Sequence, residues 1–157
     1  MCSGIAVHWR EFPDSLITRE QLNDRVVTRN GIDTKEVRFL YRDPRPQLPA
    51  LVDNELLLVE WGNRDNKQSR LPRTGWCRTE SLDAGMWRYL QPREVIIPAC
   101  LGLEKGVWFQ IREGIRAIIV LDETGGQHAY MLTEQASHYY QVMTRHDRMP
   151  CFVDQQI

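Results

Sequence analysis

The sequence predicts an α+β fold, with a largely antiparallel, barrel-like β-sheet and two or three helices in a single domain over residues 1–157. Its 157 residues match the usual size of one domain and suffice to bury a core. Short apolar or alternating segments recur between turn residues and predict six to eight strands. These segments follow one another instead of alternating with helices, which favours an antiparallel arrangement.

The first half of the chain is expected to hold three strands and one helix. Thr18 and Gln21 have the spacing of a capping box and predict the start of a helix. That helix would run to about Arg29 and end at Asn30-Gly31. Three prolines within residues 43–49 predict an extended, rigid loop. Apolar segments predict strands at residues 4–8, 37–41 and 55–61.

The second half is expected to be richer in strands. Residues 79–90 predict a short helix, and Thr133-Glu134 predicts the start of another that runs to about Thr144. Residues 100–106, with Glu104 among apolar neighbours, are expected to form a turn. Arg112-Glu113-Gly114 has a hairpin signature and would join the strands on either side. The predicted strands are residues 93–98, 107–111, 115–121, 128–132 and 151–153.

Composition excludes several classes of protein. No apolar run approaches 18 residues, so we expect no membrane span. No basic stretch followed by an apolar one opens the chain, and we therefore expect no signal peptide and a cytoplasmic location. The cysteines and histidines show no metal-ligand spacing, so we expect neither metal nor disulfides. We also expect no cofactor and a monomer. The cysteines are Cys2, Cys77, Cys100 and Cys151.

A basic segment stands out in a chain whose net charge is −1. From Arg64 to Arg78, five basic side chains accompany a single acidic one, Asp65. Trp61 and Trp76 border this segment. Basic side chains neutralise phosphates and indole rings stack on unpaired bases, so the segment is a candidate platform for single-stranded nucleic acid. The structural alternative is a solvated loop between two core tryptophans.

The first residues, Met1-Cys2-Ser3, hold a second candidate feature. Aminopeptidases remove Met1 when the next side chain is small, and removal would make Cys2 the terminal residue. A terminal cysteine carries an amine and a thiol that titrate at roughly pH 8 and pH 8.5. Two nucleophiles would then lie on one residue. The alternative is an ordinary cysteine that happens to occupy position 2.

The N-terminal residues and the basic segment belong to a longer pattern, which also includes Glu104 and His146. Cys2 follows Met1, Glu104 follows Ile97-Pro98-Ala99, and His146 opens the run His-Asp-Arg-Met-Pro. Together with Trp61-Gly62 and Arg78-Thr79-Glu80, this order resembles the SRAP family, the SOS-response-associated peptidases or abasic-site processing proteins. The matching pieces extend from Cys2 to Pro150. Without the resemblance, Glu104 would be taken for a surface turn residue and His146 for a helix C-terminal cap.

The resemblance implies a function in the SOS response to DNA damage. Family members recognise abasic sites in single-stranded DNA and form a covalent protein–DNA linkage, a thiazolidine, through the N-terminal cysteine. It implies three catalytic residues: Cys2 as nucleophile, Glu104 as general acid/base, and His146 as the acid that opens the sugar ring. It also implies a DNA-binding set, in which Arg78 and Arg148 hold phosphates and the Pro44 ring lies against a base. The rest of that set is Trp61, Gly62, Asn63, Arg64, Trp76 and Met149.

The chain departs from the family pattern at its amide side chains. Trp76 and Tyr41 occupy positions where the family has Asn, and Asn63 is a candidate to supply the missing amide. Three functions therefore stay open. The first is covalent capture of single-stranded DNA containing abasic sites. The second is an N-terminal cysteine peptidase with autoproteolytic or lyase-like activity, and the third is a non-catalytic single-stranded DNA-binding module.

Overall fold

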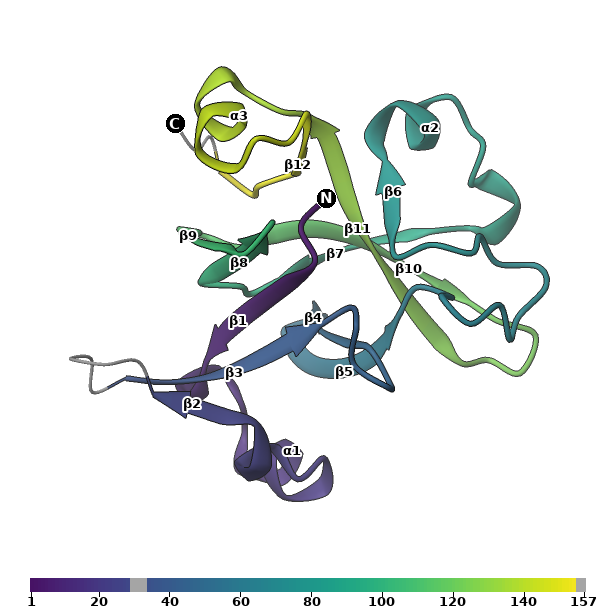
Figure 1. The fold of residues 1–157 in the computed structure, drawn as a ribbon. Coiled ribbons are helices and arrows are strands. Elements are labelled where there is room, and N and C mark those ends of the chain that lie inside the picture. The colour runs from purple at the N-terminus through teal and green to yellow at the C-terminus, as the bar shows by residue number, and fades with distance from the viewer. Residues whose placement is uncertain (29–33, 155–157) are drawn as a thin grey trace.

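Two β-sheets dominate the computed structural model, which describes residues 1–28 and 34–154 (Figure 1). The expected α+β fold is confirmed. The first sheet is antiparallel throughout and has the strand order β2-β3-β1-β8-β9. Its strands are β1 (Gly4–His8), β2 (Val26–Thr28), β3 (Lys35–Leu40), β8 (Leu101–Glu104) and β9 (Val107–Gln110).

The second sheet closes into a barrel. Five strands follow one another in the order β10-β7-β4-β5-β11, and pairing of β10 with β11 completes the ring. Two short strands, β6 (Trp76–Arg78) and β12 (Arg148–Pro150), extend this sheet along β11. The ring strands are β4 (Gln47–Val52), β5 (Glu55–Trp61), β7 (Arg93–Ile97), β10 (Ile115–Leu121) and β11 (Gln127–Gln135).

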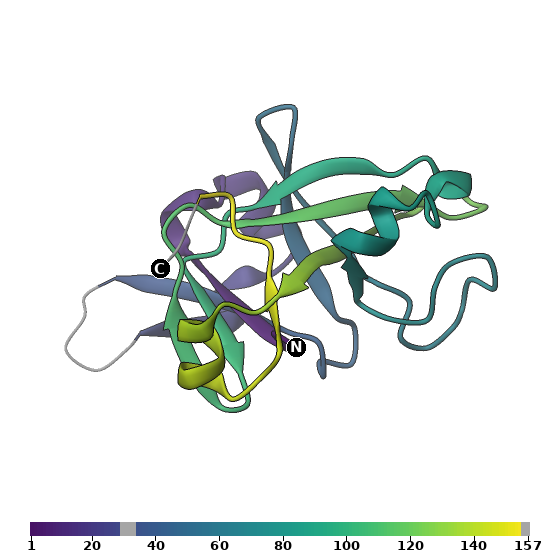
Figure 2. The same ribbon diagram turned by 90° about the horizontal axis from the view of Figure 1, so that it is seen from above.

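The helices are short and lie at the ends of the sheets. Among the described residues, no helix has the length and apolar character needed to cross a membrane. In α3 the Ser137 side chain caps the first turn by accepting a hydrogen bond from the Tyr140 backbone. In both views, α3 and β12 lie beside the N-terminus (Figures 1 and 2). The α-helices are α1 (Asp14–Arg19), α2 (Thr79–Asp83) and α3 (His138–Thr144); the 3₁₀ helices are η1 (Trp9–Glu11), η2 (Leu22–Arg25) and η3 (Arg88–Leu90).

One large apolar cluster fills the space shared by the two sheets. It includes Ile5 and Phe39 from the first sheet and Trp61 and Met131 from the barrel. A smaller cluster, around Trp87 and Tyr130, packs beneath the basic segment. Because side chains from both sheets meet in the larger cluster, the N-terminal strand is fixed inside the fold.

The predicted helix from Thr18 to Arg29 is wrong. α1 ends at Arg19, η2 follows, and residues 26–28 pair with β3 as a strand. Two β-branched valines and a threonine favour extended backbone there. Gln21 also interrupts any continuous helix, because its φ is 54°. The proposed helix stop at Asn30-Gly31 lies outside the described residues.

The turn predicted at residues 100–106 is also wrong in its first part. Residues 101–104 form β8, and the turn is confined to Lys105 and Gly106, both with positive φ. The hairpin thus joins β8 to β9. Residues 112–114 instead connect β9 of one sheet to β10 of the other.

Three further boundaries differ from the predictions. β11 continues through Gln135, because residues 133–135 pair with β12, and α3 therefore starts only at His138. The strand predicted at residues 151–153 is replaced by β12 and a single bridge between Phe152 and Ile115. The proline loop is shorter than expected, since β4 begins at Gln47 and includes Pro49.

Candidate active site at the N-terminus

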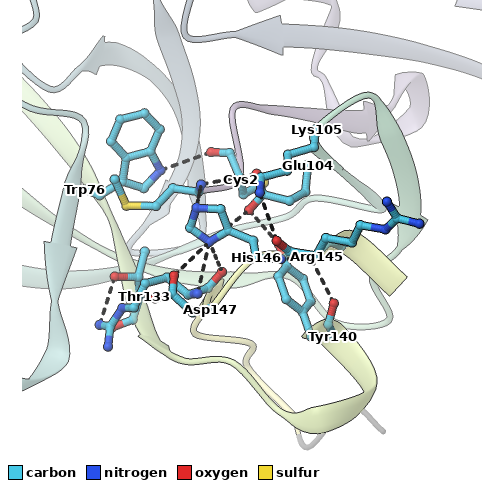
Figure 3. Close-up of polar contacts among 12 residues, drawn as sticks. Cys2, Trp76, Glu104, Lys105, Thr133, Tyr140, Arg145, His146 and Asp147 are labelled. Carbon is cyan, nitrogen blue, oxygen red and sulfur yellow. Dashed lines mark hydrogen bonds and ion pairs between the residues drawn. The ribbon is translucent and has the colours of Figure 1, made fainter. Parts of the chain in front are cut away.

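The N-terminus meets two side chains from distant parts of the sequence (Figure 3). Antiparallel pairing of β1 with β8 continues to Ser3, whose backbone N–H donates to the Leu103 carbonyl at 2.8 Å. Residues 1 and 2 therefore lie against Glu104 at the end of β8. His146 follows α3 and approaches from the other side. The site thus depends on pairing between strands that lie far apart in the sequence.

The terminal amine lies between a carboxylate and an imidazole. The Met1 α-ammonium is 3.2 Å from Glu104 Oε2 and 2.8 Å from His146 Nε2. Glu104 is only 2% exposed, and the Tyr140 hydroxyl donates to its Oε1 at 3.2 Å. A carboxylate this deeply buried needs a compensating charge and hydrogen bonds, and the amine and Tyr140 supply them.

Both ring nitrogens of His146 have close polar contacts. Nε2 is 2.8 Å from the terminal amine. Nδ1 is 3.0 Å from the Arg148 backbone N–H and 3.1 Å from the Arg148 carbonyl oxygen. Contacts within the residue 146–148 turn thus hold the ring with Nε2 directed at the amine. His146 is thereby placed to take a proton from the amine, as a nucleophilic amine requires.

The Cys2 thiol lies beneath the amine in an apolar setting. Cys2 is 1% exposed, and Sγ donates to the Gly4 carbonyl at 3.2 Å. Burial raises the pKa of the Cys2 thiol to about 12, so the thiol is neutral at physiological pH. The Trp76 indole N–H donates to the Cys2 carbonyl at 3.0 Å. Hydrogen bonds therefore hold both the thiol and the backbone carbonyl of Cys2.

Three aromatic rings adjoin this site. The Tyr41 and Trp76 ring centroids are 4.6 Å apart, and Trp61 lies 5.2 Å from Tyr41. Trp61 has no exposed surface, and its indole N–H donates to the Gly75 carbonyl at 2.9 Å. A base has no access to Trp61 in this conformation. Tyr41 and Trp76 are half-buried and keep part of their surface open.

Gly62 and Asn63 shape the basic segment from within. The buried Asn63 amide donates to the carbonyls of Gln68 and Leu71, at 2.7 and 3.0 Å. All the hydrogens on its amide are thus directed into the loop, so Asn63 does not replace the amide missing at Trp76. Gly62 has φ of +64°, and a Cβ there would lie 2.1 Å from the Thr74 carbonyl oxygen. Only glycine fits this position.

Arg64 binds backbone instead of projecting into solvent. Its Nη1 donates to the carbonyls of Tyr41 and Asp43, at 2.6 and 2.9 Å, and Nη2 donates to that of Pro44 at 3.3 Å. The guanidinium thus joins the basic segment to the Pro44 loop, while Pro44 itself is exposed. Of the two arginines that the resemblance assigns to phosphates, only Arg78 is exposed.

The other one, Arg148, is 9% exposed and engaged in the protein. It donates to both Glu80 oxygens, at 2.8 and 3.3 Å, and to the Thr133 carbonyl at 2.9 Å. The Arg148 guanidinium, helped by the Thr79 hydroxyl, lowers the pKa of Glu80 to about 2. Met149 is half-buried, and its sulfur lies 3.5 Å from the Ser137 backbone N–H. Arg148 and Met149 thus hold β12 and α3 in place behind His146.

No protein-family model matches this chain, and a search of curated proteins found no match. The resemblance stated above therefore stays a prediction. Within residues 1–28 and 34–154, no three His, Cys, Asp or Glu side chains gather as metal ligands would.

Sequence reasoning misses Tyr140 and does not predict the contact that Trp76 makes. Helical spacing places Tyr140 on an apolar face, but its hydroxyl contacts Glu104. The border of the basic segment indicates Trp76 only as a base-stacking ring, yet its indole holds the Cys2 carbonyl. The signal that could have found both contacts is chemical, because a tyrosine hydroxyl or an indole N–H that is shielded from solvent needs an acceptor.

Proposed function

We propose that the chain binds abasic sites in single-stranded DNA and, after loss of Met1, forms a thiazolidine with the sugar aldehyde through Cys2. The observation that carries the proposal is the Met1 amine held between Glu104 and His146, directly before the buried Cys2 thiol. Loss of Met1 would leave the Cys2 amine one residue from this position, where His146 would take its proton and make it nucleophilic. The exposed basic side chains and half-buried aromatic rings nearby suit a single strand.

The proposed chemistry balances without a cofactor. The Cys2 amine attacks the aldehyde carbon of the ring-opened sugar, and loss of water gives an imine. The thiol then adds across the C=N bond, so that sulfur bonds to carbon and the thiol proton passes to nitrogen. Glu104 serves as the acid/base during loss of water. In this order the amine reacts first and the thiol follows.

A crosslinking assay tests the proposal. The protein, shown by intact mass to lack Met1, is incubated with single-stranded DNA that contains one abasic site and is then run on a denaturing gel. We expect a denaturation-resistant band from the wild type and none from Cys2→Ala. With borohydride present, Cys2→Ala should regain a band, because its terminal amine still forms an imine that the reductant traps.

Other results would favour the remaining functions. A shift seen only on a native gel would indicate a non-catalytic binding module. Cleavage of a peptide without any DNA adduct would indicate a peptidase. Absence of a borohydride-trapped band in both proteins would rule out the amine as the reacting group.

An N-terminal tag gives an independent prediction. Any residue before Cys2 converts the Cys2 amine to an amide and prevents closure of the thiazolidine ring. We therefore expect a protein with an uncleavable N-terminal tag to form no denaturation-resistant adduct, whereas a C-terminal tag should have no effect. Full-rate crosslinking by the N-terminally tagged protein would contradict the imine route.

A further inference from the structure

A basic cavity lies on the far side of the Pro44 loop from the basic segment. It has a volume of about 440 Å³ and is lined by Arg25, Arg38, Leu40, Asp43, Pro44 and Arg45. Three guanidinium groups thus face one carboxylate. Asp43 also uses one oxygen to accept the Leu40 backbone N–H at 3.0 Å. The lining is therefore positively charged and suits an anion.

The arginines differ in how firmly they are held. Arg38 pairs with Glu36 at 3.3 Å and lies 4.7 Å from the Trp108 ring centroid. Arg25 lies over Phe39, 5.6 Å from its ring centroid, and its Nη1 is buried with no hydrogen-bond acceptor among the described residues. Arg45 is exposed. Two of the three guanidinium groups, those of Arg38 and Arg25, are therefore held by the protein.

One residue that lines the cavity, Leu40, lies on the strand next to the N-terminal strand. Leu40 pairs in register with Gly4, and the next residue, Tyr41, donates its backbone N–H to the Ser3 carbonyl at 2.9 Å. The Tyr41 ring packs on Trp76, which holds Cys2. The wall of the cavity is therefore continuous with the backbone that positions Cys2.

A second cavity, of about 270 Å³, shares Pro44 and Arg45 with the first. It adds Lys67 from the basic segment, together with Glu60 and Asp65. Two basic side chains there are balanced by two carboxylates, so the excess of positive charge lies in the first cavity.

We propose that the cavity of Arg25, Arg38 and Arg45 binds a phosphate group of the single strand, on one side of the nucleotide that reaches Cys2. The choice of DNA as the source of the phosphate rests on the proposed function. Arginine forks match the geometry of phosphate oxygens, and three arginines line the cavity against one carboxylate. The cavity then fixes the direction in which the strand crosses the Pro44 loop.

Binding of unmodified single-stranded DNA tests this inference separately from the chemistry. Affinity is measured by fluorescence anisotropy over a range of salt concentrations for the wild type, Arg45→Gln and the double variant Arg25→Gln/Arg45→Gln. Arg93→Gln is the matched control, since Arg93 is 56% exposed and pairs with Asp53 on the barrel, away from the cavity. Thermal unfolding checks that each variant is folded.

We expect Arg45→Gln to bind several-fold more weakly and the double variant about tenfold more weakly or worse. The slope of log affinity against log salt should decrease by about 0.7 for each phosphate that the variant no longer neutralises. Arg93→Gln should match the wild type. An effect that requires a 5′-phosphate on the strand would identify the bound group as a terminal phosphate, and an effect on strands with and without it would identify an internal phosphodiester.

Two outcomes would overturn the inference. In one, a folded double variant keeps the wild-type affinity and salt slope. In the other, inorganic phosphate stabilises the wild type but not the double variant while strand affinity is equal in both, which would indicate a site for free phosphate. Failure of the proposed function has a different signature. The wild type would then form no covalent adduct with abasic DNA, whatever the variants do with unmodified DNA.

Discussion

At the scale of single residues, the ion pair between the terminal amine and Glu104 is the central contact of the site. Glu104 has almost no contact with solvent and accepts from Tyr140. Exchanging it for glutamine keeps the side-chain shape and the Tyr140 bond but removes the charge. This exchange therefore separates the effect of the negative charge of Glu104 from the effect of its packing.

We expect Glu104→Gln to slow adduct formation with abasic DNA by about a hundredfold or more, the usual contribution of a general acid/base. The rate is measured by quenching the crosslinking reaction at successive times. Tyr140→Phe keeps the carboxylate and serves as the control, with a smaller decrease. A wild-type rate in Glu104→Gln would show that the carboxylate takes no part.

The buried thiol gives a second prediction at this scale. Because the pKa of Cys2 is raised to about 12, very little thiolate exists near neutral pH. In protein that retains Met1, iodoacetamide should modify Cys2 at least about a hundredfold more slowly in the folded state than in urea. Peptide mass spectrometry follows the reaction. Cys77, whose pKa burial also raises to about 12, should be equally slow, and rapid labelling of folded Cys2 would contradict the burial.

At the scale of elements, the turn between β10 and β11 anchors the start of the basic segment. Asp122 Oδ1 accepts from the Thr124 hydroxyl and backbone, at 2.7 and 2.9 Å, and Oδ2 lies 2.7 Å from His128 Nε2. The other ring nitrogen of His128 is 2.9 Å from the Gly62 carbonyl oxygen. A single carboxylate thus connects the turn to the basic segment.

Asp122→Asn should therefore lower the free energy of unfolding by about 2 kcal/mol at pH 7. The hydrogen bond from Thr124, followed by that from His128, lowers the pKa of Asp122 in the folded state. Its stabilising contribution is complete above the unfolded pKa of roughly 3.9 and is lost as the pH falls toward the lower folded value. Urea denaturation should thus show a smaller difference between wild type and variant at pH 3 than at pH 7. An equal difference at both pH values would refute the assignment.

The elements also show which parts of the fold the sequence could predict. β1 and β5 have the predicted bounds, because each is an apolar run ended by a polar or glycine residue. β8 is not predicted, since Leu-Gly-Leu-Glu becomes a strand by pairing with β9 on one side and with β1, about a hundred residues earlier, on the other. Contacts between residues far apart in the sequence also explain why parts of the site could not be predicted. The family resemblance named Glu104 and His146, but no local pattern predicts that Trp76 holds Cys2 or that Arg148 is engaged with Glu80.

At the scale of the whole molecule, Trp61 links the two sheets. It belongs to the barrel strand β5, has no exposed surface, and packs against Tyr41 at the end of the first sheet. We expect Trp61→Ala to lower the free energy of unfolding by about 3–5 kcal/mol in urea denaturation. Tyr139→Ala, at a side chain 58% exposed, should change it by less than about 0.5 kcal/mol. A small effect at Trp61 would mean that the sheets are stabilised independently.

The contacts of Arg64 affect which side chains of the Pro44 loop can change without altering the path of the loop. Its guanidinium fixes the Pro44 loop through main-chain carbonyls, which every amino acid possesses. Tyr41 and Asp43 also stabilise the loop through their side chains, by packing on Trp76 and by accepting the Leu40 backbone N–H. The side chain at position 44 is exposed, so related proteins could exchange it while Arg64 preserves the path of the loop. Exchange of Arg64 itself would remove this freedom, because each new loop sequence would then have to fold on its own.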